Sequence, residues 1–182
     1  MTGLSASGGV VRIDVLICTF RRPSVEETLR SVEAQHLPGG VSIRAIVADN
    51  DDRPSASSRI AGVAAAMTTS VVYVHAPARN ISLARNACLD RADGDFVAFI
   101  DDDEEAASDW LAALYRSATQ GGFDAVFGPA IARYDEAAPN WIRAHDYHSN
   151  RPLRRGGEAI AGCRMRASPL GGRRERHQHL FL

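Results

Sequence analysis

Residues 96–105 read Phe96-Val97-Ala98-Phe99-Ile100-Asp101-Asp102-Asp103-Glu104-Glu105, a short apolar run that ends in five consecutive acids. The run is rich in aromatic and β-branched residues and lacks a helical period, so it predicts a buried strand with the acids at its carboxyl end. Open α/β sheets bind their ligands at that end of the strands. Two unit charges about 4 Å apart repel by roughly 4 kcal/mol at an effective dielectric near 20, so a divalent metal is the expected partner of the acids. Through that metal, the acids would hold a phosphorylated substrate.

A second interpretation of the acids stays open on the run alone. Acidic runs are often solvated loops or helix starts, and residues 101–105 precede an apolar-periodic segment with Trp110, Leu111, Leu114 and Tyr115. Acids at the start of such a helix are stabilised by its dipole. The position directly after a buried strand favours the metal site.

Composition indicates one globular domain. The chain has 182 residues, of which 45% are hydrophobic and 24% charged, enough for a single well-packed core. No apolar stretch approaches the roughly 20 residues that span a bilayer, and residues 1–9 lack the features of a secretory signal, so we expect a cytoplasmic protein. Three scattered cysteines without a CxxC pair indicate neither a disulfide framework nor a thiolate zinc site.

Charge divides the chain unevenly. Residues 1–163 carry 16 Arg and 21 acids, net -5, whereas residues 164–182 carry five Arg and one acid, net +4, and Lys is absent. The basic tail lacks the interleaved aromatics of a nucleic-acid-binding arm, and its two histidines, His177 and His179, lack further zinc ligands. We therefore expect a flexible N-terminus at 1–10, a domain at 11–163 and an irregular, disordered basic tail at 164–182, with no nucleic-acid partner.

The remaining pattern alternates strands and helices. Strands are predicted at 13–20, 41–48, 71–75, from Asp95 and at 124–128, and helices at 55–67 and 108–119. Ser24 and Glu27 predict a capping box for a first helix, and Asn80 or Ser82 is expected to cap a third. Strands joined by helical segments imply parallel pairing. The predicted class is α/β, with a mostly parallel sheet flanked by helices.

Two common phosphate-binding classes do not match. A Rossmann dehydrogenase requires GxGxxG after the first strand, where this chain has Thr19-Phe20-Arg21-Arg22-Pro23, and a P-loop requires a lysine. A metal-dependent phosphohydrolase would draw acids or histidines from several strand ends, and His75 alone gives little support for one.

Four segments, in their order and spacing, resemble the amino-terminal half of family-2 glycosyltransferases of the GT-A fold. They are Val15-Leu16-Ile17-Cys18-Thr19-Phe20-Arg21-Arg22-Pro23, Val47-Ala48-Asp49-Asn50, Ala84-Arg85-Asn86-Ala87 and Phe99-Ile100-Asp101-Asp102-Asp103. The resemblance covers roughly residues 11–163. It is greatest to bacterial exopolysaccharide enzymes such as the succinoglycan glucosyltransferases.

This resemblance implies a UDP-sugar donor lying across the carboxyl ends of the first strands. Thr19, Phe20 and Arg21 match the donor-binding loop after the first strand, where the family contacts nucleobase and ribose. Asp49 matches the acid that accepts a hydrogen bond from uracil. The alternative for Asp49 is an Asx turn with Asn50 and Asp51.

The other donor residues follow from the same resemblance. Arg85 and Asn86 match the helix that faces the nucleotide, and Arg79 lies near enough in sequence to help neutralise phosphate. Asp101 and Asp102 are expected at the donor, and Asp103 is expected to ligate Mg²⁺ or Mn²⁺.

The resemblance does not extend to the catalytic residues. The resemblance implies transfer with inversion at the anomeric carbon, which needs a base from a Glu-Asp-type motif. That motif is missing after Gly162-Cys163, so no catalytic residue is assigned. The switch to Arg-rich sequence there suggests a shifted reading frame or a truncation. We expect a metal-dependent enzyme that acts on a saccharide or lipid-linked acceptor, in the cytoplasm or at the inner face of the membrane. The alternative is a non-catalytic or truncated nucleotide-sugar-binding domain.

Overall fold

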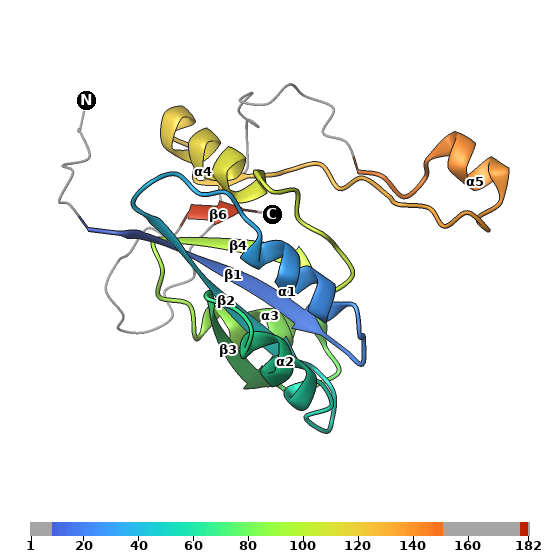
Figure 1. The fold of residues 1–182 in the computed structure, drawn as a ribbon, viewed down its shortest axis with the longest axis horizontal. Helices are drawn as coiled ribbons and strands as arrows, with labels where there is room; N and C mark the ends of the chain where they lie inside the picture. Colours follow the sequence, from blue (N-terminus) through green and yellow to red (C-terminus); the bar gives the residue numbers. More distant parts are fainter. Residues whose placement is uncertain (1–8, 151–178, 182) are drawn as a thin grey trace.

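A single parallel sheet organises the chain in the computed structural model, which describes residues 9–150 and 179–181. The sheet has six strands in the order β3-β2-β1-β4-β6-β5 (Figure 1), and every neighbouring pair is parallel. The strands are β1 (Val11–Thr19), β2 (Val41–Asp49), β3 (Ser70–His75), β4 (Phe96–Asp101), β5 (Ala125–Val126) and β6 (His179–Phe181).

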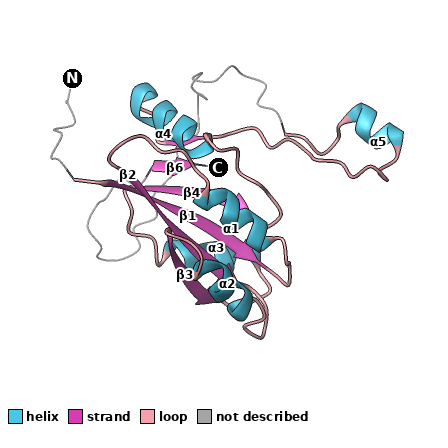
Figure 2. Ribbon diagram, in the orientation of Figure 1, coloured by secondary structure: helices cyan, strands magenta, loops and turns pink. Residues whose placement is uncertain are grey.

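Helices cover both faces of this sheet (Figure 2). They are α1 (Val25–Glu33), α2 (Ser57–Ala64), α3 (Ile81–Leu89), α4 (Trp110–Gly121) and α5 (Asn140–His145). Alternate β1 side chains enter two cores: Ile13, Val15 and Ile17 pack with α1, α2 and α4, whereas Leu16 and Cys18 pack with α3. The predicted α/β class and parallel sheet are confirmed.

Helix capping agrees with the prediction only in part. Asn80 caps α3, because its side chain accepts hydrogen bonds from the backbone nitrogens of Ser82 at 2.9 Å and Leu83 at 3.3 Å. The capping box predicted at Ser24 and Glu27 is wrong. Ser24 has helical backbone angles, φ -57° and ψ -20°, and its side chain makes no capping hydrogen bond, whereas a capping residue normally has an extended backbone.

The end of the chain differs from the irregular tail that we predicted. Strand β6 lies between β4 and β5, with Leu180 opposite Val97 of β4 and Ala125 of β5. Two neighbouring strands offer backbone partners on both sides, so a three-residue segment is ordered by pairing. The rest of the tail and the N-terminal residues 1–8 lie outside the described residues.

A long excursion follows β5. It carries α5 well away from the sheet (Figure 1), and an isolated antiparallel bridge between Ala130 and Asn150 brings its two sides together. In the described part of the chain, none of the helices is both long and apolar enough to span a bilayer.

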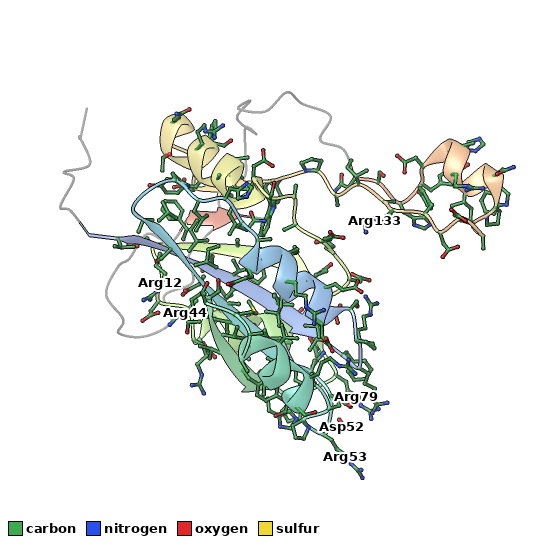
Figure 3. The ribbon with its side chains drawn as sticks, viewed as in Figure 1. Arg12, Arg44, Asp52, Arg53, Arg79 and Arg133 are labelled. Atoms are coloured by element: carbon green, nitrogen blue, oxygen red, sulfur yellow. The ribbon has the colours of Figure 1, made fainter. Side chains whose placement is uncertain are left out.

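Charged side chains gather at both ends of the sheet (Figure 3). Arg12 and Arg44 lie at the amino-terminal end and Arg79 and Asp52 at the carboxyl end. At the amino-terminal end, the buried Asp14 carboxylate accepts hydrogen bonds from Arg44 Nε at 3.0 Å and Nη2 at 2.6 Å.

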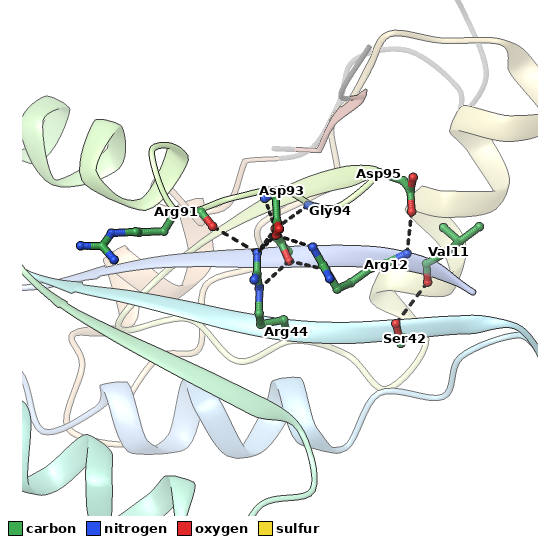
Figure 4. Close-up of polar contacts among 9 residues, drawn as sticks. Val11, Arg12, Ser42, Arg44, Arg91, Asp93, Gly94 and Asp95 are labelled. Atoms are coloured by element: carbon green, nitrogen blue, oxygen red, sulfur yellow. Dashed lines mark hydrogen bonds and ion pairs between the residues drawn. The ribbon is translucent and has the colours of Figure 1, made fainter. Parts of the chain in front are cut away.

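The same carboxylate holds the turn between α3 and β4, whose residues Arg91, Asp93 and Gly94 are labelled in Figure 4. Asp14 Oδ2 accepts hydrogen bonds from the backbone nitrogens of Asp93 and Gly94, both at 2.8 Å. A Cβ on Gly94 would lie 2.8 Å from the Arg12 carbonyl oxygen, so only glycine allows this approach. The cluster therefore ties the start of β4 to β1 and β2, and β4 ends in the acids.

Candidate functional site

A pocket of about 540 Å³ lies at the carboxyl ends of β1, β2 and β4, where the sequence predicted a ligand site. Its lining combines a short apolar patch with basic and acidic side chains from loops that are far apart in sequence. The lining residues are Cys18, Thr19, Phe20, Arg22, Asn50, Arg79, Ile81, Arg85, Asp101, Asp102 and Asp103.

The end of β1 and the loop after it present Thr19, Phe20 and Arg22 to the pocket, but not Arg21. Arg21 instead forms a two-pronged ion pair with Asp51, with Nε–Oδ2 and Nη2–Oδ1 distances of 2.8 Å. Hydrogen bonding from this guanidinium holds the pKa of Asp51 well below its usual range. Arg21 thus joins the loops after β1 and β2, and its neighbour Arg22, which the sequence did not single out, reaches the pocket.

Asp49 is buried beneath the pocket and does not line it. Its Oδ1 accepts a hydrogen bond from the Asp51 nitrogen at 3.1 Å. Its Oδ2 accepts from the Ala56 nitrogen at 2.8 Å and the Tyr73 hydroxyl at 2.9 Å. Burial and the Asp49 carboxylate together raise the pKa of Tyr73. The Asx turn, left open as the alternative for Asp49, is present.

Asn50 lines the pocket and was not predicted as a site residue. Its backbone nitrogen donates to the Thr19 carbonyl at 2.8 Å, and its own carbonyl accepts from the Arg79 nitrogen at 3.2 Å. Its side-chain oxygen accepts from the Asn80 nitrogen at 3.0 Å. Asn50 therefore connects the end of β1 with the loops that follow β2 and β3. Two sequence signals were available for it: Asn50 lies just after a predicted strand, and it belongs to the segment Val47-Ala48-Asp49-Asn50 that carries the resemblance.

Two further arginines, Arg79 and Arg85, line the pocket. Arg79 forms an ion pair with Asp52 (Figure 3) and has a left-handed backbone, φ +46°. Arg85, on α3, lies 3.3 Å from Asp101 between Nη2 and Oδ1. Asn86 is exposed on the same helix and is not part of the lining.

The three aspartates after β4 all line the pocket but differ in exposure. Asp101 and Asp103 are exposed, whereas Asp102 is only 6% exposed. Burial raises the pKa of Asp102, and the nearby charge of Arg22 only partly offsets that effect. The helix-start interpretation is not what the structure shows, because α4 begins at Trp110 and has no acid in its first turn.

Helix α1 and Gln35, just after its end, support the loop that follows the aspartates. The Thr28 hydroxyl donates to the Glu104 carbonyl at 2.8 Å, and the Ser31 hydroxyl accepts from the Ala106 nitrogen at 3.0 Å. Gln35 donates to the Ala107 carbonyl at 2.7 Å. The aspartates therefore belong to a loop whose following residues, 104–107, are held by these hydrogen bonds.

The donor atoms around the acids fit a hard cation. Two buried oxygens of lining residues, Thr19 Oγ1 and Asp102 Oδ2, have no hydrogen-bond partner within the described segments. Among the described residues, no three acidic, His or Cys side chains converge on one metal position, and Arg22 and Arg85 pair with the aspartates. Mg²⁺ is usually held by one or two carboxylates together with substrate phosphates and waters, so the oxygen set suits a cation that arrives with a phosphorylated ligand.

Comparisons with known proteins identify the family of this chain. A family model described as glycosyl transferase family 2 matches residues 14–174, which extends past Cys163, where the resemblance in the sequence ended. The succinoglycan biosynthesis protein ExoM of Rhizobium meliloti (strain 1021) is 45% identical over 170 residues, 90% of this chain and 55% of that protein. The chain thus spans about half the length of this relative.

Solved structures show the same fold. The crystal structure of S. aureus TarS 1-349 has a TM-score of 0.57 and 17% identity, covering 71% of this chain and 39% of that one. Its complex with UDP-GlcNAc has a TM-score of 0.55 and 17% identity, covering 71% and 37%. The predicted GT-A-type architecture is confirmed.

Proposed function

The chain belongs to glycosyl transferase family 2, and we propose that it binds a UDP-sugar and transfers the sugar to a saccharide or lipid-linked saccharide acceptor. The observation that carries this proposal is the pocket at the strand ends, where three arginines meet three aspartates. Support also comes from a relative named for succinoglycan biosynthesis and from the UDP-GlcNAc complex of a protein with the same fold. The product would be an exopolysaccharide.

We assign the nucleoside to the β1 side of the pocket. Phe20 is 40% exposed and offers an aromatic face, and the Thr19 hydroxyl is a polar atom without a partner among the described residues. Apolar surface with a few placed polar groups is typical of small-molecule sites. Asp49 enters this proposal mainly by ordering the loop that presents Asn50, because both carboxylate oxygens already accept hydrogen bonds.

We assign the diphosphate to Arg79 and Arg85. Both guanidiniums line the pocket and now pair with exposed acids, Asp52 and Asp101, and arginine suits phosphate because its planar fork donates two hydrogen bonds at once. Asn86 remains a predicted contact beside Arg85, on the exposed side of α3.

We assign the divalent cation to the three aspartates at the end of β4. Asp103 is the proposed ligand to Mn²⁺ or Mg²⁺, with Asp102 beside it and Asp101 directed toward the ribose. A bound cation would supply Lewis-acid stabilisation of the charge that develops on the leaving diphosphate. The chain's own part is to hold these carboxylates on a loop that α1 fixes in place.

The acceptor half of the reaction has no assigned residue. An inverting transfer needs a base within hydrogen-bond reach of the acceptor hydroxyl, and the Glu-Asp-type motif that would supply it was not found in the sequence. A second candidate function is therefore a nucleotide-sugar-binding domain without transfer activity. The cytoplasmic location, at the inner face of the membrane for a lipid-linked acceptor, is part of the first proposal.

Calorimetry and an activity assay separate these functions. We expect UDP to bind in the presence of Mn²⁺ and to bind at least tenfold more weakly when EDTA removes the metal. CDP serves as the control for base recognition. Transfer or hydrolysis of UDP-glucose supports the enzyme; UDP binding without either supports the binding domain. Failure of UDP to bind with Mn²⁺ contradicts both.

A further inference from the structure

Arg22 contacts two consecutive acids of the pocket. From the loop after β1, its Nη1 lies 3.3 Å from Asp102 Oδ1 and also forms an ion pair with Asp103 Oδ2. All three residues line the pocket. The Arg22 side chain is 52% exposed, so it can leave these acids without disturbing the core.

The same two acids are the proposed neighbours of the divalent cation. A guanidinium and a divalent cation at one carboxylate repel each other. Asp102 keeps a second oxygen, Oδ2, that is buried and unpartnered within the described residues. Arg22 therefore neutralises the two acids only in part and leaves Asp102 Oδ2 without a partner among the described residues.

We propose that Arg22 is an internal counter-ion that competes with the divalent cation for Asp103 and Asp102 and moves to the donor diphosphate when the cation binds. This inference rests on the proposed function, because the diphosphate is the new partner of Arg22. In the nucleotide-free protein, the cation must displace Arg22 and leave it without an acidic partner. With the diphosphate present, Arg22 regains an anion.

The consequence is coupling between the two ligands. The diphosphate removes the cost of displacing Arg22, so each ligand strengthens binding of the other by the same factor. A neutral side chain at position 22 removes both the competition and the extra phosphate contact. The coupling factor then falls even though no metal ligand has changed.

The test compares Arg22→Gln with a matched charge change, Arg30→Gln. Arg30 is 63% exposed and pairs with Glu26 one turn away on α1, and it does not line the pocket. Mn²⁺ binding to the full chain is measured by electron paramagnetic resonance without nucleotide and with saturating UDP. Calorimetry gives UDP affinity at saturating Mn²⁺.

For Arg22→Gln, we expect nucleotide-free Mn²⁺ affinity to rise about fivefold, the upper range for losing an exposed ion pair. UDP should bind more weakly, and UDP should enhance Mn²⁺ binding by a smaller factor. Arg30→Gln should match the wild type in all three, and Arg22→Lys, which keeps the charge, should bind Mn²⁺ like the wild type.

The experiment distinguishes failure of the counter-ion role from failure of the proposed function. If Arg22→Gln binds nucleotide-free Mn²⁺ no more tightly than Arg30→Gln while the wild type binds UDP with Mn²⁺, the counter-ion role is overturned and the proposed function stands. If the wild type binds no UDP in the presence of Mn²⁺, the proposed function fails, and this inference fails with it.

Discussion

Replacing Asp49 by Asn tests whether this acid orders the pocket from below. The Asp49 carboxylate accepts three hydrogen bonds, from the Asp51 and Ala56 nitrogens and the Tyr73 hydroxyl, and the residue is fully buried. An amide presents one oxygen and one NH₂ group, so at least one buried backbone N–H loses its acceptor. An unsatisfied buried donor costs about 1–3 kcal/mol, and hydrogen bonds to a charged group are worth about 1.5–3 kcal/mol each. We expect Asp49→Asn to lose about 2–4 kcal/mol of unfolding free energy.

Urea unfolding followed by circular dichroism measures this loss. Tyr73→Phe is the matched control, because it removes only one of the three donors and should cost about 1 kcal/mol. A loss below about 0.5 kcal/mol for Asp49→Asn, within the range of ordinary surface substitutions, would refute the supporting role. Reduced UDP affinity with unchanged stability would instead indicate the direct uracil contact that the resemblance implies.

Three other predictions concern the sheet end, the pH dependence and the acid loop. Asp14→Ala should lower the free energy of unfolding in urea by about 3–5 kcal/mol, because it leaves the Arg44 guanidinium and two backbone donors without their acceptor. The control is Asp93→Ala, which should cost about 1 kcal/mol or less because the Asp93 side chain is 62% exposed. Equal losses for the two variants would contradict the role of Asp14 as the central acceptor. Burial raises the pKa of Glu33, but hydrogen bonds from Thr68 and Thr69 outweigh it and lower that pKa from 4.5 to about 2. Glu33 therefore stabilises the fold above its unfolded pKa, so the stability difference between wild type and Glu33→Gln should shrink as pH falls from about 4.5 towards 2; a constant difference across acid unfolding curves would argue against it. Thr28→Val should weaken Mn²⁺-dependent UDP binding by loosening Glu104, whereas Thr119→Val, on the exposed surface of α4, should leave calorimetric UDP affinity unchanged.

Much of the fold could be predicted from local pattern. Short apolar runs in residues 13–18 and 96–100 indicate strands buried on both faces, and alternate side chains of these strands enter the two observed cores. The acids after β4 were placed at the ligand end of the sheet for the same reason. Strand β6 was missed because three residues carry too little periodicity, and their order comes from neighbours distant in sequence.

Within the site, sequence patterns identified the loops better than the individual roles. Arg21 and Arg22 are chemically identical neighbours, and only the left-handed backbone at Arg21, φ +58°, and its ion pair with Asp51 decide which one reaches the pocket. Asn50 was missed because its role depends on hydrogen bonds from its own loop, after β2, to the end of β1 and to the loop after β3. Such long-range polar contacts leave no periodic signal in a single sequence.

Mn²⁺-dependent UDP binding by wild type and Asp103→Ala, measured by calorimetry, tests the donor site most directly. Asp103 is 53% exposed on its side chain, so the substitution should change stability by about 1 kcal/mol or less. The control is Asp90→Ala, an exposed acid at the far end of α3. We predict that Asp103→Ala loses the metal dependence of UDP binding while Asp90→Ala keeps it. Unchanged Mn²⁺-dependent UDP affinity in Asp103→Ala would contradict the assignment of this pocket as a cation-assisted donor site.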